Sequence, residues 1–190
     1  MKILIFDTET SGLPSSYKAS FSDISSWPRI VEIAWIILDG SRNPVSSSSF
    51  IVRPEGFEIS TGASNIHGIT TEKAIADGSP LRYVMACLAE DLSDVDILVA
   101  HNIDFDFPVV NCEFLRIKMP STLGRKQKYC TMRSTTGLCN IPGMYGPKWP
   151  KLEELYRFLF ARSFDEAHRA MYDVKATTEC YLELTRRGIA

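Results

Sequence analysis

Two carboxylates, Asp7 and Glu9, follow a continuous apolar run at residues 3–6. Such a run is typical of a buried strand. Acids placed at its end are unfavourable unless a cation or hydrogen bonds compensate them. Polar residues 10–12 then favour a tight turn. Taken alone, the pair is compatible both with a structural strand end and with a site that binds a cation.

A second acidic cluster follows another short apolar run, at residues 97–100. It reads His-Asn-Ile-Asp-Phe-Asp-Phe over residues 101–107 and opens an expected helix at residues 105–118. Asn102 or Asp104 could cap that helix by accepting its first amide hydrogens. Asp106 lies between two phenylalanines, which suits a rigidly held ligand better than a cap.

A third cluster places His168 and Asp173 at the entry to the last expected helix, residues 169–187. Residues five apart on a helix diverge by about 140°, so His168 and Asp173 would not share a face if both were helical. We therefore expect His168 to precede the helix and to approach a common centre from another direction. A lone histidine at such a position is usually a surface or capping residue, so its interpretation depends on the other two clusters.

The elements that must position these clusters alternate between strands and helices. With 190 residues, 45% of them hydrophobic, the chain is expected to form one domain over residues 1–190. We expect an α/β fold with a mixed central β-sheet flanked by α-helices. The first three strands could form an antiparallel meander. Expected strands are 2–6, 30–38, 50–52 and 97–100; expected helices are 70–76, 80–92, 105–118, 152–160 and 169–187; and expected loops are 14–28, 39–49 and 137–150.

Charge is unevenly distributed, although the net value is only −2. No acid occurs between Glu113 and Glu153, a segment that carries eight basic residues. Such a band could follow a phosphate backbone, or it could be a solubilising face. The eight are Arg116, Lys118, Arg125, Lys126, Lys128, Arg133, Lys148 and Lys151.

Cysteine usage and hydropathy favour a cytoplasmic protein. The five cysteines are odd in number and form no Cys-x-x-Cys pair, so we expect reduced thiols and neither disulfides nor a zinc site. No apolar run reaches the roughly 20 residues that a membrane span needs, and the first residues lack a secretory signal.

Taken together, the clusters resemble the DEDD 3′-5′ exonucleases in their histidine subclass. This family includes the proofreading epsilon subunits of bacterial polymerases, ribonuclease T, oligoribonuclease and TREX-like enzymes. The tyrosine subclass would need a tyrosine at position 169, which is an arginine. The segments that carry the resemblance are 6–13, 29–34, 66–70, 101–106 and 168–173.

The resemblance implies a ribonuclease H-like fold and metal-dependent removal of nucleoside 5′-monophosphates from the 3′ end of DNA, at single-stranded or frayed ends. Two divalent cations, Mg²⁺ or Mn²⁺, would stabilise the attacking and leaving oxygens. His168 would be the general base. The implied metal ligands, also catalytic, are Asp7, Glu9, Asp106 and Asp173.

The resemblance also places further residues near the terminal nucleotide, namely Thr8, Thr10, Leu13, His67 and Ile69. Backbone amides near Thr8 and Thr10 could hold the 3′ end, and Leu13 could act as a wedge beside the terminal base. Glu32 is expected to be a structural acid, and Phe105 and Phe107 are expected in the core rather than as stacking platforms.

Other readings remain open from the sequence. The same chemistry could act on RNA, as in ribonuclease T, or the domain could bind nucleic acid without cleaving it. A homodimer is compatible with the family. No segment follows the last expected helix that could bind a clamp or a polymerase, so we expect no such tail. Because no apolar run is long enough to span a membrane, we also expect no membrane partner.

Overall fold

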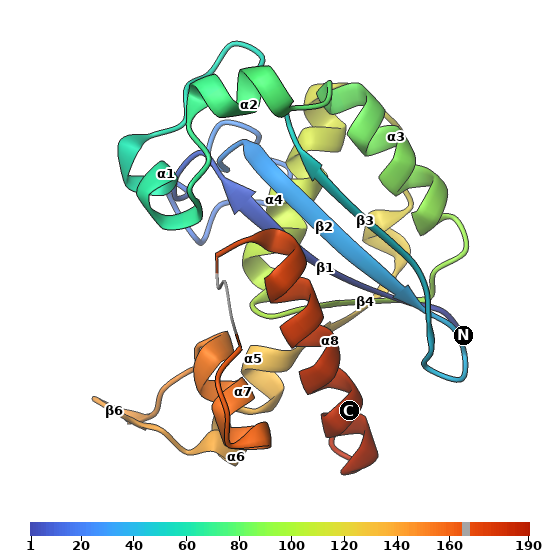
Figure 1. Cartoon of the computed structure of the whole chain (residues 1–190), viewed down its shortest axis with the longest axis vertical. Helices are drawn as coiled ribbons and strands as arrows, with labels where there is room; N and C mark the ends of the chain where they lie inside the picture. The colour runs from blue at the N-terminus through green and yellow to red at the C-terminus, as the bar shows by residue number, and fades with distance from the viewer. Residues whose placement is uncertain (165–167) are drawn as a thin grey trace.

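The computed structural model describes residues 1–164 and 168–190, which form a mixed sheet covered by helices. The strand order is β3-β2-β1-β4-β5, with β1 antiparallel to β2 and parallel to β4 (Figure 1). The antiparallel meander of the first three strands and the expected mixed α/β sheet are therefore confirmed. The strands are β1 Ile3–Thr10, β2 Ile30–Leu38, β3 Pro44–Ile51, β4 Ile97–Ala100 and β5 Gln127–Cys130.

Helices cover both faces of the sheet, which explains why β1 and β2 are apolar almost throughout. On one face, Leu4 and Phe6 of β1 share a core with α3 (Leu81–Leu92) and α4 (Ile103–Arg116). On the other face, the alternate residues Ile3 and Ile5 pack in a core with α8 (Ala170–Arg186). The ends of β1, α4 and α8 are thereby fixed relative to one another.

The remaining elements decorate this core. Helix α7 (Leu152–Phe160) packs against α8 through a smaller apolar cluster that includes Leu155 and Leu184. The segment 14–28 contains turns and bends only, as expected. The shorter elements are α1 Thr61–His67, α2 Thr71–Asp77, the 3-10 helix Leu123–Arg125, α5 Thr131–Ser134, α6 Thr136–Cys139, β6 Pro142–Gly143, β7 Gly146–Pro147 and α7 Leu152–Phe160.

Some expected boundaries were wrong. Strand β3 begins at Pro44, so the serine run at residues 46–49 is strand rather than loop. These serines are largely exposed on an edge strand. They are held in the strand by pairing with β2, so the strand does not need an apolar sequence pattern there. Helix α1 and strand β5 were not expected from the sequence, and the expected loop 137–150 contains the small hairpin β6–β7.

The expected cap of α4 was also wrong. Asn102 stands at the N-cap position with φ of 76°, and its side chain makes no capping hydrogen bond. Asp104 is exposed and pairs with Arg133, so neither residue supplies the expected cap. By contrast, the side chain of Thr70 does cap α2, accepting a hydrogen bond from the amide of Lys73.

Two further observations concern the cysteines and the lengths of the helices. All five cysteines are free. Among the described residues, no helix has the length and the apolar character that crossing a membrane requires.

Candidate active site

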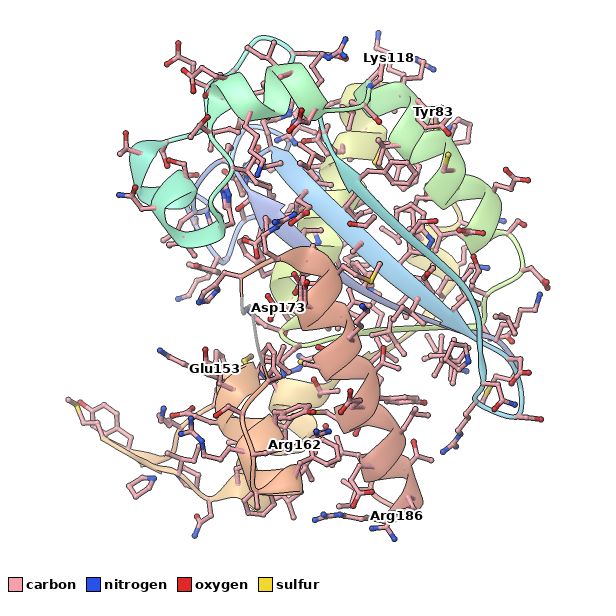
Figure 2. All side chains as sticks on the ribbon, in the orientation of Figure 1. Tyr83, Lys118, Glu153, Arg162, Asp173 and Arg186 are labelled. Carbon is pink, nitrogen blue, oxygen red and sulfur yellow. The ribbon has the colours of Figure 1, made fainter. Side chains whose placement is uncertain are left out.

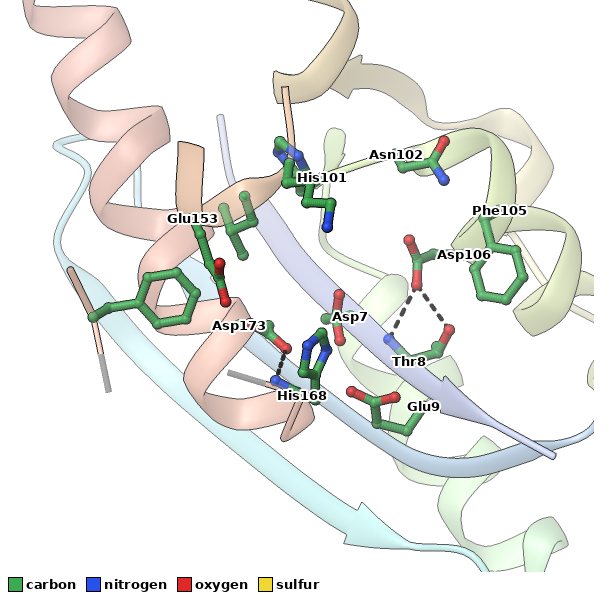
Figure 3. A pocket seen from close by; sticks show the side chains of 13 residues that line it. Asp7, Thr8, Glu9, His101, Asn102, Phe105, Asp106, Glu153, His168 and Asp173 are labelled. Atoms are coloured by element: carbon green, nitrogen blue, oxygen red, sulfur yellow. Dashed lines mark hydrogen bonds between the residues drawn. The ribbon is translucent and has the colours of Figure 1, made fainter. Parts of the chain in front are cut away.

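The four carboxylates that the resemblance selected come from three elements and, together with Glu153, line one pocket of about 300 Å³. Asp7 and Glu9 come from the end of β1, whereas Asp106 and Asp173 come from the first turns of α4 and α8. Figure 3 shows the four side chains and His168 around the same hollow. The structure therefore brings together every acid that the resemblance selected.

The parallel pairing of β1 with β4 explains how Asp106 reaches β1. Strand β4 ends at Ala100, beside β1, and α4 begins three residues later. The backbone N–H and the hydroxyl of Thr8 both donate to Asp106 Oδ1, at 3.0 and 2.7 Å. Thr8 thus lines the pocket, but its amide is engaged with Asp106 rather than open to a 3′ end.

His168 lies just before α8, as its spacing from Asp173 predicted. Its backbone N–H donates to Asp173 Oδ2 at 3.0 Å, and its φ of 71° turns the chain into the helix. The side chain is exposed. One potential ligand atom from each of Glu9, His168 and Asp173 lies within 4.8 Å of the other two. The imidazole therefore faces the same centre as the acids.

Glu32 fixes the start of α8 to β2. Its carboxylate accepts from Arg169 Nε at 3.2 Å, from Arg169 Nη2 at 3.0 Å and from the amide of Ala170 at 3.1 Å. Only 2% of Glu32 is exposed. It behaves as the expected structural acid, because its charge is compensated within the protein.

The pocket acids are electrostatically strained, and burial is the largest cause for each. Burial, followed by the charges of Asp106 and Asp173, raises the pKa of Asp7 well above its ordinary value. Burial, followed by the charge of Asp173, raises the pKa of Glu9 to about 8. Burial raises the pKa of Asp173 to about 6 against the hydrogen bond from His168. For Asp106, burial raises the pKa to about 7, although the hydrogen bonds from Thr8 oppose the shift.

This donor set fits hard divalent cations. Carboxylate oxygens are the ligands that Mg²⁺ and Mn²⁺ prefer. Acids with raised pKa values become favourable as anions only when positive charge is brought to them. The protein itself supplies hydrogen bonds to Asp106 and Asp173, which leaves Asp7 and Glu9 as the acids with most to gain from a cation.

A second hollow, of about 560 Å³, adjoins the first. The two share Thr8, Glu9 and Phe105, whereas the second is otherwise bounded by the turn after β1 and by α1. Four of the expected substrate residues line it: Thr8, Thr10, Leu13 and His67. Leu13 is 77% exposed and Ile66 of α1 is 61% exposed, so the hollow offers apolar surface beside the acids.

His67 is built into the wall of this second hollow. The amide of Ile69 donates to His67 Nδ1 at 3.1 Å, so Nδ1 accepts and Nε2 carries the proton toward the carbonyl of Thr10, 3.3 Å away. Burial lowers its pKa. The hydroxyl of Thr10 is also engaged, donating to the carbonyl of Gly12. His67 therefore joins α1 to the turn after β1 as a neutral side chain.

The structure does not bring Ile69 into either hollow. Its side chain is fully buried in a cluster with Val31 and Ala74. Phe105 differs from the expectation in the other direction, since it is only partly buried and lines both hollows. Phe107, by contrast, belongs to the core as expected.

Sequence reasoning missed several residues that line the first pocket, among them Lys151, Glu153 and Phe164. Lys151 and Glu153 mark the start of α7, and only their proximity to the helix entry could have signalled them. Figure 3 shows Glu153 directed toward the same hollow as Asp173, and the charge of Glu153 contributes to the raised pKa of Asp173.

His101 links this region to β4. Its Nε2 lies 3.0 Å from the carbonyl of Pro150 and its Nδ1 lies 2.9 Å from the hydroxyl of Thr131. A carbonyl only accepts, so Nε2 carries the proton and Nδ1 accepts from Thr131. Burial lowers the pKa of His101 to about 4. The neutral ring thus fastens the start of α7 next to the pocket.

The residues of the basic band make different kinds of contact. Arg116 pairs with buried Glu113 and donates to carbonyls of the 14–28 segment. Lys148 pairs with Glu154, whereas Lys151 lines the acidic pocket. Figure 2 shows Lys118 at the top of the molecule, away from Asp173 near its middle. The band is not one continuous phosphate track.

The chain matches one family of known proteins over most of its length. Residues 4–181 match the model of the RNase T family, which is described as an exonuclease family. No curated protein matches the chain in sequence.

Solved structures of exonuclease I share the fold. The chain is 22% identical to E. coli exonuclease I bound to a dT13 oligonucleotide, with a TM-score of 0.78, covering 98% of this chain and 42% of that one. The E. coli enzyme bound to a dA16 oligonucleotide is also 22% identical, with a TM-score of 0.75, and the match covers 97% of this chain and 41% of that one. Exonuclease I with bound product is 19% identical, with a TM-score of 0.77, and the match covers 99% of this chain and 44% of that one. This chain thus spans about two fifths of those proteins.

Proposed function

Since the chain belongs to the RNase T exonuclease family, we propose that it is a 3′-5′ exonuclease of the histidine subclass that acts on single-stranded or frayed DNA. It releases nucleoside 5′-monophosphates. The observation that carries the proposal is the convergence of four strained carboxylates on one pocket beside an exposed histidine. Oligonucleotide-bound exonuclease I among the similar folds favours DNA as the substrate.

Asp7, Glu9, Asp106 and Asp173 would hold two Mg²⁺ or Mn²⁺ ions. Such ions lower the pKa of bound water and neutralise charge that develops on the attacking and leaving oxygens. The chain prepares for them by fixing two of its acids in advance: Thr8 holds Asp106 through two hydrogen bonds, and the amide of His168 holds Asp173.

His168 acts as the general base. Its imidazole faces Glu9 and Asp173 and is exposed, so it can take a proton from the attacking water and pass it to solvent. The water oxygen bonds to phosphorus as the 3′ oxygen of the preceding nucleotide leaves. The Glu32 contacts to Arg169 and Ala170 hold the backbone on the helix side of His168.

The hollow beside the acids accounts for cleavage at a strand end. It is lined by apolar surface from Leu13, Ile66 and Phe105, which can receive a terminal base without selecting its identity. Because Glu9 and Phe105 line both hollows, a nucleotide seated in the second hollow places its phosphate toward the acids.

A product ladder tests the proposal. Single-stranded DNA, duplex DNA and RNA of one sequence, each labelled at the 5′ end, are incubated with Mg²⁺ or Mn²⁺ and with a chelator. We expect stepwise shortening of single-stranded DNA that stops on chelation. The variant His168→Ala should lose at least about 100-fold in rate, in line with the loss of a general base.

The matched control is Lys73→Ala, which removes an exposed side chain on α2 and should keep the full rate. Shortening that survives chelation would refute the metal-dependent mechanism, and a near-normal rate for His168→Ala would remove the histidine from it. A ladder confined to RNA would replace the DNA substrate by RNA.

A further inference from the structure

Residues 141–151 form a projecting arm between α6 and α7. Its outer part is the hairpin β6–β7, which extends away from the rest of the fold (Figure 1). The turn consists of Met144 and Tyr145, whose exposed fractions are 86% and 97%, and Trp149 nearer the base is 63% exposed. Three large apolar side chains are thus exposed to solvent on one short segment. Exposing such groups to water has a free-energy cost, which binding a partner would remove.

The hairpin is built to hold its shape. Gly146 has φ of 124°, and a Cβ on Gly143 would lie 2.7 Å from the carbonyl oxygen of Gly146, so both positions require glycine. Pro142 and Pro147 pair across the hairpin and restrict its φ angles. An arm with few conformations loses little entropy when it binds a partner.

The base of the arm is fixed to the rim of the acidic pocket. His101 donates to the carbonyl of Pro150, and Lys148 forms an ion pair with Glu154 at 2.6 Å. Lys151, the last residue of the arm, lines the pocket itself. Going outward along the chain from the pocket, Lys151, Trp149 and Tyr145 therefore form a path of a cation, an indole and a phenol.

The chemistry of this path fits a single nucleic-acid strand. Aromatic side chains stack on bases of any identity, and lysines follow the phosphates. The arm carries no acid, since none occurs between Glu113 and Glu153, so nothing on it repels a polyanion. Continuity with the pocket favours the substrate strand over an unrelated protein as the occupant.

We propose that the arm binds the substrate strand upstream of the nucleotide being removed, with Tyr145 and Trp149 stacking on bases and Lys151 contacting a phosphate. This inference rests on the proposed exonuclease function and adds a second region of contact to it. The arm raises affinity for long strands and takes no part in the cleavage step.

The length of the arm defines which substrates it reaches. Tyr145 is five residues before Pro150, so an extended chain carries the tip up to roughly 17 Å from the pocket rim. Stacked nucleotides rise about 3.4 Å each, so the tip meets bases roughly five nucleotides from the end. A trinucleotide is too short to reach it.

The experiment compares single-stranded DNA of 3 and 12 nucleotides in wild type and in the double variant Met144→Ala/Tyr145→Ala. Loss of base stacking should raise KM for the 12-mer by about 5- to 30-fold and leave its kcat unchanged. Both parameters for the trinucleotide should stay within about twofold, and the melting temperature should not change because both side chains are exposed. The matched control is Tyr83→Ala, an exposed tyrosine that Figure 2 shows at the upper right of the molecule, away from Asp173 and Glu153.

Equal loss on both substrates would assign the arm a structural role, and no loss on either would overturn the inference, leaving a protein as the occupant of the arm. Fluorescence anisotropy of the labelled 12-mer in chelator measures strand binding without cleavage. If wild type cleaves nothing but binds the 12-mer more tightly than the double variant does, the exonuclease proposal fails and the arm remains a strand-binding element. If cleavage is normal but both proteins bind alike, only the arm proposal fails.

Discussion

Glu9 and Glu32 stand directly opposite each other on β1 and β2, yet their surroundings differ sharply. Like charges in this position are unfavourable. The carboxylate of Glu32 accepts hydrogen bonds from the Arg169 guanidinium and from the amide of Ala170. Within the described residues Glu9 forms no ion pair, and its pKa rises to about 8.

The difference separates a structural acid from a site acid. Glu113 follows the pattern of Glu32. It is fully buried, forms ion pairs with Arg29 and Arg116, and accepts a hydrogen bond from the amide of Ile30. A carboxylate whose charge the fold already compensates has little to offer an added cation. A carboxylate left strained beside three others gains from one, and this makes Glu9 a better candidate ligand than its neighbour.

Neutralising the two glutamates should therefore have opposite effects on stability. Glu9→Gln removes a strained charge, so the metal-free protein should melt at a higher temperature at pH 8 while activity falls by at least about 100-fold, as for the loss of a metal-site group. Thermal melts in chelator and the DNA ladder measure the two effects. A lower melting temperature would show that Glu9 is compensated in a way that the structure does not reveal.

Glu32→Gln should instead destabilise the protein, because it leaves Arg169 and the amide of Ala170 with a weaker acceptor. We expect a loss of about 1–3 kcal/mol in the free energy of unfolding, less than the 3–5 kcal/mol typical of a fully buried pair, since 39% of the Arg169 side chain is exposed. Urea melts measure this loss. Asp104→Asn breaks the exposed pair with Arg133 and, as control, should change stability by less than about 0.5 kcal/mol.

The contrast between compensated and strained acids also predicts a pH dependence. The pKa values of Asp173, Asp106 and Glu9 are raised to about 6, 7 and 8. A carboxyl whose pKa is raised by folding stabilises the folded state below its unfolded pKa, and this stability is lost as pH rises through the folded value. The metal-free protein should lose stability between about pH 5 and pH 8.

Added Mn²⁺ should reverse that loss, so the rise in melting temperature on adding Mn²⁺ should be larger at pH 8 than at pH 6. Scanning calorimetry with Mn²⁺ or with chelator at both pH values checks this. An equal rise at the two pH values would contradict the view that the cation replaces protons on these acids.

How far the sequence predicts these features depends on how local each signal is. The apolar runs of β1 and β4 and the spacing of His168 from Asp173 are local, and from them we expected the acidic clusters and the histidine to approach one centre, where the structure brings them together. The predicted strand at residues 50–52 was shorter than β3, because the serines of β3 adopt strand structure only through pairing with β2. The cap expected at Asn102 was wrong because its φ of 76° depends on how β4 turns into α4.

Compensation of charge was less accessible from the sequence. Nothing local distinguishes Glu9 from Glu32, since the partner of Glu32 lies 137 positions away, at Arg169. The roles of Lys151 and His101 were missed for the same reason, because their contacts join segments that meet only after folding. The resemblance to the family selected the acids of the candidate site, whereas the charge compensation of each acid could be described only from the structure.

Asp106 is the intermediate case, and the smallest predicted effect concerns it. Two hydrogen bonds from Thr8 lower its pKa against the effect of burial, so Asp106 is compensated in part. Thr8→Val removes the hydroxyl donor and keeps the backbone one. We expect the acid limb of the pH-rate profile to move to higher pH, the rate at pH 7 to fall by about 3- to 10-fold, and stability to fall by about 1 kcal/mol, as for the loss of one hydrogen bond.

Thr10→Val is the matched control, because it makes the same chemical change two residues along the strand, where the hydroxyl donates to the carbonyl of Gly12 rather than to a carboxylate. It should leave the acid limb in place even if affinity for the substrate changes. A shift of the same size in both variants would mean that the hydroxyl of Thr8 acts on the strand and not on the charge of Asp106. A shift in Thr8→Val alone would show that compensation in this pocket is graded, from Glu32 through Asp106 to Glu9.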